Sequence, residues 1–279
     1  MNPAPRLPYW LLIVFVLVMA LPCDAHAQSA AAKGQFEPRV GQEGKDVVWV
    51  PSPQAVVNKM LDLAKVTPKD YVIDLGSGDG RTVITAAKRG ARALGIEYNP
   101  NMVELSKRNA AKEGVSDKAT FQKADLFETD FSQATVITMF LLPDINLKLR
   151  PKILDLKPGT RIASNTFTMG DWAADQTATV NEDCLSYCTA LLWIVPAKVA
   201  GAWHLPQGEL TLKQTFQIIS GTLKSGNVIT PLTNARLTGD QISFTAGNTQ
   251  YTGRVNGNAM EGTVKGGSDS KWHATREGN

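Results

Sequence analysis

The sequence is poor in the side chains that hold metals or disulfide frameworks. It contains three cysteines and three histidines among 279 residues, and no paired C-x-x-C motifs that would indicate structural zinc. We therefore expect no metal site. Cys184 and Cys188 are close enough in sequence to form a disulfide in an oxidising compartment, and two free thiols are an equally acceptable outcome at this level.

Charge of one sign is also scarce. The 29 basic and 26 acidic side chains leave a formal net charge of +3. So weak a bias gives no reason to expect nucleic acid or an anionic membrane surface as a partner. After the first residues no apolar run approaches the roughly 20 residues of a membrane helix, so no integral span is expected after residue 27. The sequence does not give the oligomeric state.

The N-terminal residues have the three parts of a secretory signal peptide. Arg6 supplies a positive charge, residues 10–21 form an unbroken apolar run, and Ala25-His-Ala27 is a small-x-small cleavage site before Gln28. Residues 1–27 are therefore predicted to be a signal peptide, and the mature chain to be exported to the periplasm or outside the cell. The alternative is an uncleaved N-terminal membrane anchor.

The rest of the chain divides into three parts. Residues 28–46 are small and polar and predict a flexible leader. Residues 47–196 alternate between apolar strands and amphipathic helices, which predicts a doubly wound, Rossmann-like α/β sheet. Strands are expected at 71–75, 91–97, 119–123, 134–140 and 160–164, and the segments 177–181 and 189–195 predict an antiparallel hairpin that completes the sheet. The first helix is expected to begin with Ser52 as N-cap and Pro53 at its first position.

Residues 197–279 have a different texture. Helical periodicity disappears, and short Thr-, Val- and Ile-rich runs alternate with turn dipeptides such as Gly239-Asp240 and Asn256-Gly257. This pattern predicts a small all-β domain of antiparallel strands, either a sandwich or a barrel. Trp203 and Trp272 are candidates to fill its core.

The segment with the clearest chemical meaning is Val72-Ile-Asp-Leu-Gly-Ser-Gly-Asp-Gly80, between a predicted strand and a predicted helix. Its glycines permit positive φ and lack Cβ atoms, so a ligand can lie against the backbone at the carboxyl end of the sheet. The third glycine comes one residue earlier than in the G-x-G-x-x-G motif of dinucleotide-binding proteins. The carboxylates of Asp74 and Asp79 disfavour a phosphate and favour a cationic sulfonium or ammonium group.

Two further acidic residues follow the next predicted strands. Glu97 ends the second strand, where a carboxylate can accept hydrogen bonds from both hydroxyls of a ribose, although NAD enzymes also place an acid there. Asp125 follows the third strand, where it can accept the exocyclic amine of adenine, and alone it would be an ordinary loop aspartate. Three acids in order, each at the carboxyl end of a strand, indicate a nucleoside cofactor.

These segments resemble the cofactor motifs of class I S-adenosylmethionine (SAM)-dependent methyltransferases, over residues 48–196. Val50-Pro-Ser-Pro53, Gly78-Asp-Gly-Arg81 and Glu97-Tyr-Asn-Pro100 further resemble the small lysine methyltransferases related to the mitochondrial ATP-synthase c-subunit enzyme. The resemblance implies that 47–196 is a SAM-dependent methyltransferase domain. The cofactor-binding residues that it implies are Asp74, Gly76, Ser77, Gly78, Gly80, Glu97, Tyr98, Asp125 and Leu126.

The same resemblance implies a role for several of these residues. Asp74, Gly76 and Gly78 would line the methionine part of SAM. Glu97 would hold the ribose and Asp125 the adenine amine. Pro51 and Ser52 would lie near the entrance to the cofactor site.

The segment after the fourth strand departs from a common methyltransferase pattern. It is Met139-Phe-Leu-Leu-Pro143 instead of Asn-Pro-Pro-Tyr, which counts against methylation of DNA bases or glutamine and offers no general base. No catalytic residue is identified. Four apolar side chains are candidates for a desolvating lysine pocket, although a core position is the favoured interpretation for large apolar residues; they are Phe140, Leu141, Phe167 and Trp172. Asp144 and Asp171 are expected to be solvated loop residues.

The leading hypothesis is a SAM-dependent methyltransferase of the EC 2.1.1 class that acts on a protein side chain, with lysine favoured. SAM is made in the cytosol, whereas an exported chain works outside it. The alternative is therefore an exported, non-catalytic binding protein that keeps the methyltransferase fold and uses its β-domain as the interaction module. An NAD-dependent oxidoreductase fits less well because of the glycine spacing.

Overall fold

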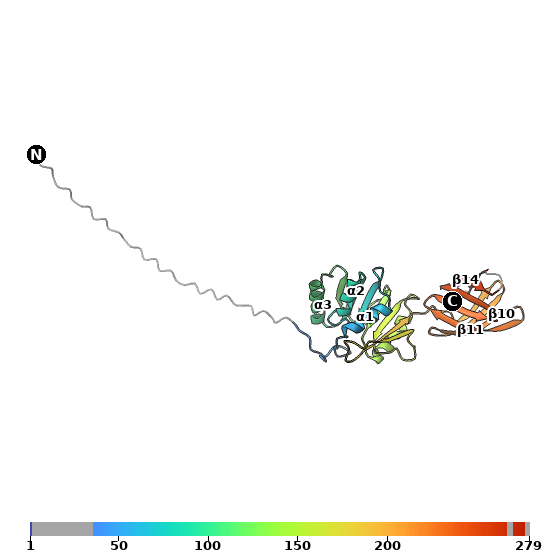
Figure 1. Ribbon diagram of the computed structural model, residues 1–279, viewed down its shortest axis with the longest axis horizontal. Coiled ribbons are helices and arrows are strands. Elements are labelled where there is room, and N and C mark those ends of the chain that lie inside the picture. The colour runs from blue at the N-terminus through green and yellow to red at the C-terminus, as the bar shows by residue number, and fades with distance from the viewer. Residues whose placement is uncertain (2–35, 267–269, 277–279) are drawn as a thin grey trace. The chain divides into compact units, whose positions relative to one another are not determined.

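The structure is a computed structural model that describes Met1 and residues 36–266 and 270–276 (Figure 1). Apart from Met1, the predicted signal peptide lies outside the described residues, as do residues 28–35 of the predicted leader. Of the helices in the described ranges, none has the length and apolar character needed to span a bilayer.

A seven-stranded sheet is formed within residues 71–194. Its strands are β1 (Tyr71–Leu75), β2 (Arg92–Glu97), β3 (Ala119–Lys123), β4 (Val136–Met139), β5 (Arg161–Asn165), β6 (Gln176–Thr179) and β7 (Thr189–Ile194). The spatial order is β3-β2-β1-β4-β5-β7-β6. The strands β1 to β5 pair in parallel, whereas β7 is antiparallel to both β5 and β6. The predicted doubly wound sheet with an antiparallel hairpin is confirmed.

Helices cover both faces of this sheet. They are α1 (Gln54–Leu63), α2 (Arg81–Lys88), α3 (Pro100–Lys112) and α4 (Pro143–Leu154). Alternate residues of β1 enter two different cores: Val72 packs with residues of α1 to α3, and Ile73 with residues of α4. Because both faces are buried, the central strands are nearly continuous apolar runs rather than alternating ones. The chain runs from β1 to β2 and β3 on one side of β1 and then crosses to β4 on the other side. This reversal of direction leaves a crevice at the carboxyl ends of these strands.

The start of α1 differs from the prediction. Pro53 is the N-cap residue, the helix begins at Gln54, and no side chain caps it. Ser52 is instead buried, and its Oγ accepts a hydrogen bond from Nδ2 of Asn165 at 3.0 Å. Ser52 therefore ties the segment before α1 to the end of β5 rather than capping the helix.

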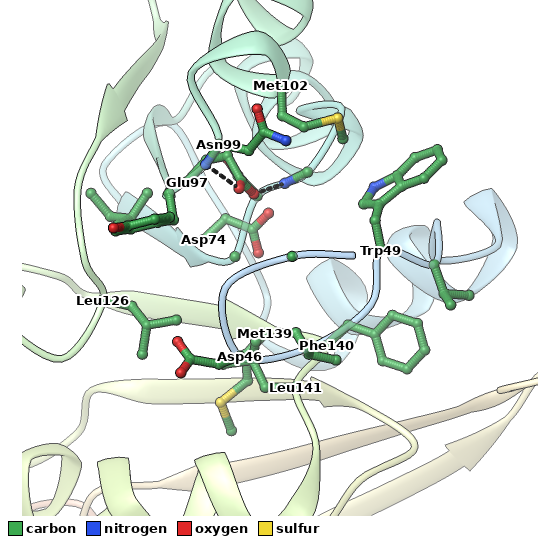
Figure 2. Close-up of a pocket in the computed structure, with 18 of the residues that line it drawn as sticks. Asp46, Trp49, Asp74, Glu97, Asn99, Met102, Leu126, Met139, Phe140 and Leu141 are labelled. Carbon is green, nitrogen blue, oxygen red and sulfur yellow. Dashed lines mark hydrogen bonds between the residues drawn. The ribbon is translucent and has the colours of Figure 1, made fainter. Parts of the chain in front are cut away.

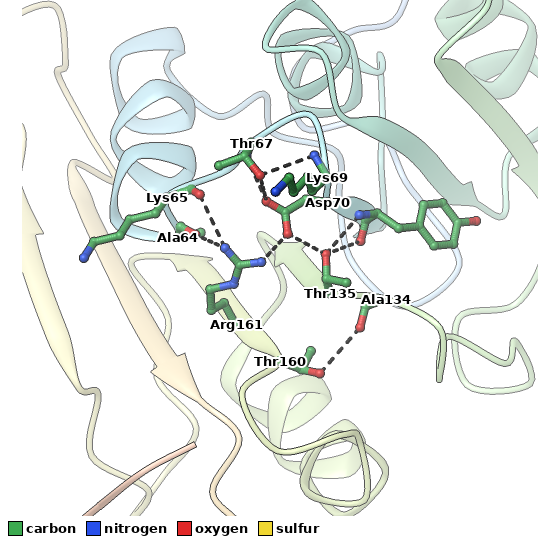
Figure 3. A network of polar contacts seen from close by, with 10 residues as sticks. Ala64, Lys65, Thr67, Lys69, Asp70, Ala134, Thr135, Thr160 and Arg161 are labelled. Carbon is green, nitrogen blue, oxygen red and sulfur yellow. Dashed lines mark hydrogen bonds and ion pairs between the residues drawn. The ribbon is translucent and has the colours of Figure 1, made fainter. Parts of the chain in front are cut away.

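A partly buried polar network holds the opposite end of the sheet, where the parallel strands begin (Figure 3). Arg161 forms an ion pair with Asp70 and donates to the carbonyl of Ala64, just after α1, at 2.7 Å. Oγ1 of Thr135 donates to Asp70 at 2.8 Å and accepts the backbone N–H of Tyr71 at 2.9 Å. These contacts join the starts of β1, β4 and β5 away from the crevice.

The C-terminal strands form a closed antiparallel barrel. They are β8 (Gly201–Leu205), β9 (Gly208–Thr215), β10 (Ile218–Ser225), β11 (Val228–Thr238), β12 (Gln241–Ala246), β13 (Thr249–Asn256), β14 (Ala259–Lys265) and β15 (Ser270–Thr275). Trp203 and Trp272 lie in one core, as expected. Of the two expected all-β forms, the barrel is the one found, because β15 returns to pair with β8.

Candidate active site

A cavity lies in the crevice at the carboxyl ends of β1, β2 and β4 (Figure 2). Most of its lining comes from residues 42–52, the glycine-rich loop after β1, and the segments that follow β2, β3 and β4; Phe167 and Tyr187 also line it. Eight of the nine predicted cofactor-binding residues line this cavity, and Gly80 does not; the eight are Asp74, Gly76, Ser77, Gly78, Glu97, Tyr98, Asp125 and Leu126. Pro51 and Ser52 line it as well.

The backbone conformation of the glycine-rich loop accounts for its glycines. Gly76, Gly78 and Gly80 have φ angles of 78°, 54° and 83°, which side-chain-bearing residues rarely adopt. A Cβ on Gly78 would lie 2.6 Å from Nε1 of Trp49, so this glycine lets an indole lie against the loop.

Gly80 does not line the cavity, and other parts of the protein pack at its Cβ position. A Cβ there would lie 2.8 Å from the ring of Phe121 on β3 and 2.9 Å from Cβ of Ser106 on α3. The third glycine therefore allows the start of α2 to approach β3 and α3 closely, under the loop rather than at the cavity.

Glu97 at the end of β2 is fixed by two backbone groups. The N–H of Gly78 donates to its Oε2 and the N–H of Asn99 to its Oε1, both at 2.9 Å (Figure 2). Each carboxylate oxygen can accept a second hydrogen bond. Glu97 is thus oriented by the protein and retains acceptor capacity toward the cavity, as a ribose diol requires.

Asp74 is a buried acid at the floor of the cavity. Its side chain accepts a hydrogen bond from Oγ1 of Thr138 at 2.6 Å, and the residue is 5% exposed. Burial raises the pKa of Asp74 to about 7, opposed by the hydrogen bond from Thr138 and reinforced by the charges of Asp79 and Glu97. A cation placed beside this group would stabilise its ionised form, so the site favours a positively charged ligand.

Asp125 is paired within the protein. Nζ of Lys45 lies 2.7 Å from Oδ2, and the N–H of Phe127 donates to Oδ1 at 2.9 Å. The hydrogen bond from Lys45, followed by that from Phe127, lowers the pKa of Asp125 below its ordinary value. The carboxylate is therefore ionised at neutral pH and can accept a hydrogen bond from an amine.

Lys45 belongs to a part of the predicted leader that has defined contacts. Gly41 N–H donates to the carbonyl of Trp49, and Trp49 N–H donates to that of Gln42, both at 2.9 Å. This turn carries Lys45 to Asp125 and Trp49 to Gly78. Sequence reasoning missed both contacts, because residues 36–50 form no helix or strand.

Ser77, Tyr98 and Leu126 complete the predicted set. Tyr98 is half-exposed, and Nζ of Lys45 lies 5.4 Å from its ring centroid. Leu126 projects into the cavity (Figure 2). Oγ of Ser77 is buried without a hydrogen-bond partner and occupies the space beside Gly95, where a Cβ would lie 2.5 Å from it. Ser77 thus accounts for a glycine on β2.

The other half of the cavity is apolar and aromatic. Phe140 and Leu141 after β4 and Phe167 after β5 line it, which corrects the favoured core interpretation for the two phenylalanines. Trp172 does lie in the core, fully buried, with its carbonyl accepting from Nε1 of Trp193 at 2.7 Å. The rings of Phe140 and Phe167 contact Tyr187, a residue that sequence reasoning missed.

The remaining candidates do not join the site. Asp144 is exposed in the first turn of α4, and Asp171 is exposed and paired with Arg150, as expected of solvated acids. In the described ranges, no cluster of three or more potential ligands suits a metal ion. Cys184 and Cys188 form a disulfide between β6 and β7.

Comparison with known proteins points to one kind of chemistry. Residues 74–176 match the family model of the ANTKMT methyltransferase domain. The chain is 41% identical over 152 residues to a protein-lysine N-methyltransferase of Saccharolobus islandicus, covering 53% of this chain and 94% of that protein. It is 39% identical over 128 residues to the human lysine N-methyltransferase named for the C-subunit of ATP synthase, covering 46% of this chain and 54% of that protein. The match therefore spans about half the length of the human relative.

A solved structure carries the same fold with a ligand. The crystal structure of an RNA methyltransferase from Salinibacter ruber in complex with S-adenosyl-L-homocysteine is 46% identical, with a TM-score of 0.50. The similarity covers 54% of this chain and 96% of that one. Its ligand is the demethylated product of SAM, with an uncharged sulfur, so the comparison supports a sulfur nucleoside as the ligand and SAM as the cofactor.

Proposed function

Because the chain belongs to the family of SAM-dependent methyltransferases that includes the Saccharolobus islandicus protein-lysine N-methyltransferase, we propose that it methylates the side-chain amine of a protein lysine. The observation that carries the proposal is the 41% identity to that enzyme over 94% of the enzyme's length. An aromatic and apolar acceptor side, with no acidic or basic side chain on the segment 139–142, supports it.

The cofactor would be held by the nucleoside half of the cavity. The free lone pairs of Glu97 suit the two ribose hydroxyls, and the ionised Asp125 suits the adenine amine. Asp74 suits the cationic methionine end, since a positive charge there lowers the cost of ionising a buried carboxyl group. SAM supplies an activated methyl group on a sulfonium.

The protein's own task is then to bind and orient the amine. A protonated lysine has no lone pair, so the acceptor must lose a proton before it can attack the methyl carbon. Phe140, Leu141 and Phe167 offer an environment of low polarity, which disfavours the ammonium form and lowers the pKa of a lysine placed there. Positioning a neutral nucleophile in line with the sulfonium accounts for the rate without a general base.

The proposal is tested by incubating the full chain with SAM labelled in its methyl group and an extract of the source cells. Protein and RNA fractions are separated, the protein is hydrolysed, and the label is assigned to an amino acid. We expect Nε-methyl-lysine, and strongly reduced transfer with Glu97→Ala at a SAM concentration near the wild-type Kd. Label confined to another amino acid, or to RNA, would contradict lysine as the acceptor.

RNA is the second candidate acceptor, because the Salinibacter ruber neighbour is described as an RNA methyltransferase at 46% identity. Two observations favour protein. The net charge of +3 offers little attraction for a polyanion, and the curated relatives cited above are lysine enzymes. The RNA fraction in the same experiment decides between the two.

We also propose that the mature chain works outside the cytosol. The signal-peptide pattern of residues 1–27 supports export, and a disulfide between Cys184 and Cys188 suits an oxidising compartment. Fractionation of the source cells, followed by N-terminal sequencing, tests this. A mature chain beginning at Gln28 in the exported fraction is expected; an intact chain in the cytosol would contradict it.

A further inference from the structure

Three aromatic rings from three separate loops meet at one side of the cavity. Phe140 follows β4, Phe167 follows β5, and Tyr187 precedes β7, whose start lies at the carboxyl edge because β7 runs antiparallel to β5. All three residues line the cavity. Ring centroids lie 5.8 Å apart for Phe140 and Phe167, 5.1 Å for Phe140 and Tyr187, and 5.8 Å for Phe167 and Tyr187. We call these three rings the aromatic wall.

The aromatic wall occupies the half of the cavity that the nucleoside residues leave open. Glu97 and Asp125 follow β2 and β3, whereas the wall follows β4 and β5 on the other side of β1. In Figure 2, Asp74 lies between Glu97 on one side and Phe140 with Leu141 on the other. A methyl acceptor that approaches a cofactor bound beside Asp74 therefore comes along the wall.

The chemistry of the aromatic wall suits a long alkylamine. The methylene stem of a lysine can pack on the apolar ring surfaces, and its charged form is attracted to the exposed ring of Tyr187 before the amine reaches the less polar space beside Phe140 and Leu141. Tyr187 contributes the outermost ring, since it is 40% exposed and sits against both phenylalanines. It is the member of the wall that an incoming side chain meets first.

The loop that carries Tyr187 is constrained. Tyr187 and Asp183 have φ angles of 56° and 54°, a left-handed conformation that is unfavourable for residues other than glycine. The Cys184–Cys188 disulfide closes the loop, and Cys184 packs against the core formed by α1 to α3 and β1. The N–H of Val180 also donates to the carbonyl of Cys188 at 2.8 Å. A cross-link that removes alternative loop conformations favours this one.

We propose that Tyr187 is a specificity-determining residue of the acceptor channel, and that the Cys184–Cys188 disulfide is a positioning element that holds it on Phe140 and Phe167. The inference rests on the proposed function. Reduction by a dithiol transfers two electrons and two protons to the disulfide, yields two thiols, and leaves the dithiol as a cyclic disulfide. The freed loop then relaxes, and acceptor binding weakens while cofactor binding does not.

The test uses the full chain and a degenerate peptide pool with one fixed central lysine and no other lysine. Variants are Tyr187→Ala, Tyr187→Phe and the double variant Cys184→Ser/Cys188→Ser. Leu185→Ala is the matched control, because Leu185 is fully exposed in the same loop. The readouts are kcat and KM for the pool, the Kd for SAM, and the melting temperature as a check of folding.

We expect Tyr187→Ala to raise the KM for the pool about tenfold, with kcat and the Kd for SAM changed less than about twofold, because removing a ring that does not touch the reacting atoms weakens acceptor binding alone. Tyr187→Phe and Leu185→Ala should match the wild type. The Cys184→Ser/Cys188→Ser variant should show a raised KM. Dithiothreitol should raise the KM of the wild type by the same factor and should leave the KM of the double serine variant unchanged. An unchanged KM in Tyr187→Ala, or an equal response to dithiothreitol without the cysteines, would overturn the inference.

A binding measurement separates this inference from the proposed function. The protein loaded with S-adenosylhomocysteine is titrated calorimetrically with acetyl-lysine methylamide and with its uncharged counterpart acetyl-norleucine methylamide. One outcome is that the pool is not methylated, but the lysine compound binds more tightly than the norleucine compound and loses affinity in Tyr187→Ala. The proposed function is then wrong, and the role of the aromatic wall is supported. The other outcome is that the pool is methylated, but Tyr187→Ala changes neither the KM nor the affinity for the lysine compound. The role of the aromatic wall is then wrong, and the proposed function is supported.

Discussion

The backbone N–H of Gly78 donates to Oε2 of Glu97 at 2.9 Å, and this bond ties the glycine-rich loop after β1 to the end of β2. The carboxylate that would bind a ribose therefore also sets the shape of the loop beside it. Changes at either residue are expected to affect cofactor binding through both routes.

Glu97→Ala is expected to weaken SAM binding about 100-fold, since hydrogen bonds to a charged group contribute about 1.5–3 kcal/mol each. The measurement is the Kd for SAM by calorimetry. Glu104→Ala is the matched control, because Glu104 is an exposed acid on α3 that forms an ion pair with Lys107. Equal affinities for the two variants would remove Glu97 from the site.

Gly78→Ala is expected to weaken SAM binding while the protein stays folded, because the loop or Trp49, both in the cavity lining, must shift. The added Cβ meets Nε1 of Trp49 at 2.6 Å, at a φ of 54°. Gly114→Ala is the control for conformational strain alone, because Gly114 has a φ of 68° with open space around its Cβ position. Circular dichroism and SAM titration of both variants separate strain from lost binding; retained affinity in Gly78→Ala would contradict the placement of the site.

Binding of SAM is expected to become tighter as pH rises from 6 to 7 and to level off above pH 8. The pKa of Asp74 is raised to about 7 by burial, so below pH 7 the free protein keeps this carboxyl group protonated and uncharged. A cationic ligand requires the carboxylate, and its binding then displaces a proton. Asp74→Asn should bind SAM weakly at every pH. A wild-type affinity that is flat across this range would exclude Asp74 as the partner of the cation.

Because of Asp74, the free energy of unfolding is also expected to fall as pH rises. Its folded-state pKa exceeds the unfolded value of 3.8, so the folded state binds more protons between about pH 4 and 7, and unfolding becomes easier across this window. The free energy of unfolding of the wild type, minus that of Asp74→Asn, should therefore fall between pH 4 and 7. Urea titrations at several pH values measure it; a difference independent of pH would contradict the buried, protonated state.

The ion pair at the opposite end of the sheet should matter for stability and not for binding. Arg161→Met leaves the buried Asp70 carboxylate without its cation, which is expected to cost about 3 kcal/mol. The pKa of Asp70 is lowered, after the opposing effect of burial, by hydrogen bonds from Thr67, Thr135 and Arg161, so this stabilisation is present at neutral pH and is lost as pH falls through the folded-state pKa.

Arg254→Met is the control for that variant, because Arg254 pairs with Asp240 on the exposed barrel surface. Exposed pairs contribute at most about 1 kcal/mol. Urea titration at pH 7 should therefore separate the two variants clearly, while the Kd for SAM stays at the wild-type value in both. An unchanged stability in Arg161→Met would contradict a structural role for the network.

The nucleoside half of the site could be predicted from the sequence because its signals are local. Asp74, Glu97 and Asp125 each follow an apolar strand, and parallel strands bring their carboxyl ends to one edge. Gly80 does not line the cavity, and its lack of a Cβ is required by Phe121 and Ser106, which are distant in sequence. A motif alone cannot show whether a missing Cβ makes room for a ligand or for another part of the protein.

The contacts that sequence reasoning missed come from irregular segments. Lys45, Trp49 and Tyr187 lie outside helices and strands, where no periodicity indicates the direction of a side chain. The C-terminal strands were predicted by turn dipeptides, which act locally, whereas closure of the barrel depends on β15 pairing with β8 across the whole segment. Contacts between residues that are distant in sequence decide both the direction of these side chains and the closure of the barrel.

Selection of a cationic sulfur nucleoside by an acidic crevice is the property on which the proposed function depends. Calorimetric titration of the full chain with SAM and, separately, with NAD measures this selectivity. We expect saturable binding of one SAM per chain, weakened about 100-fold in Glu97→Ala, and no measurable heat with NAD. Binding of NAD in preference to SAM, or no binding of either, would refute it.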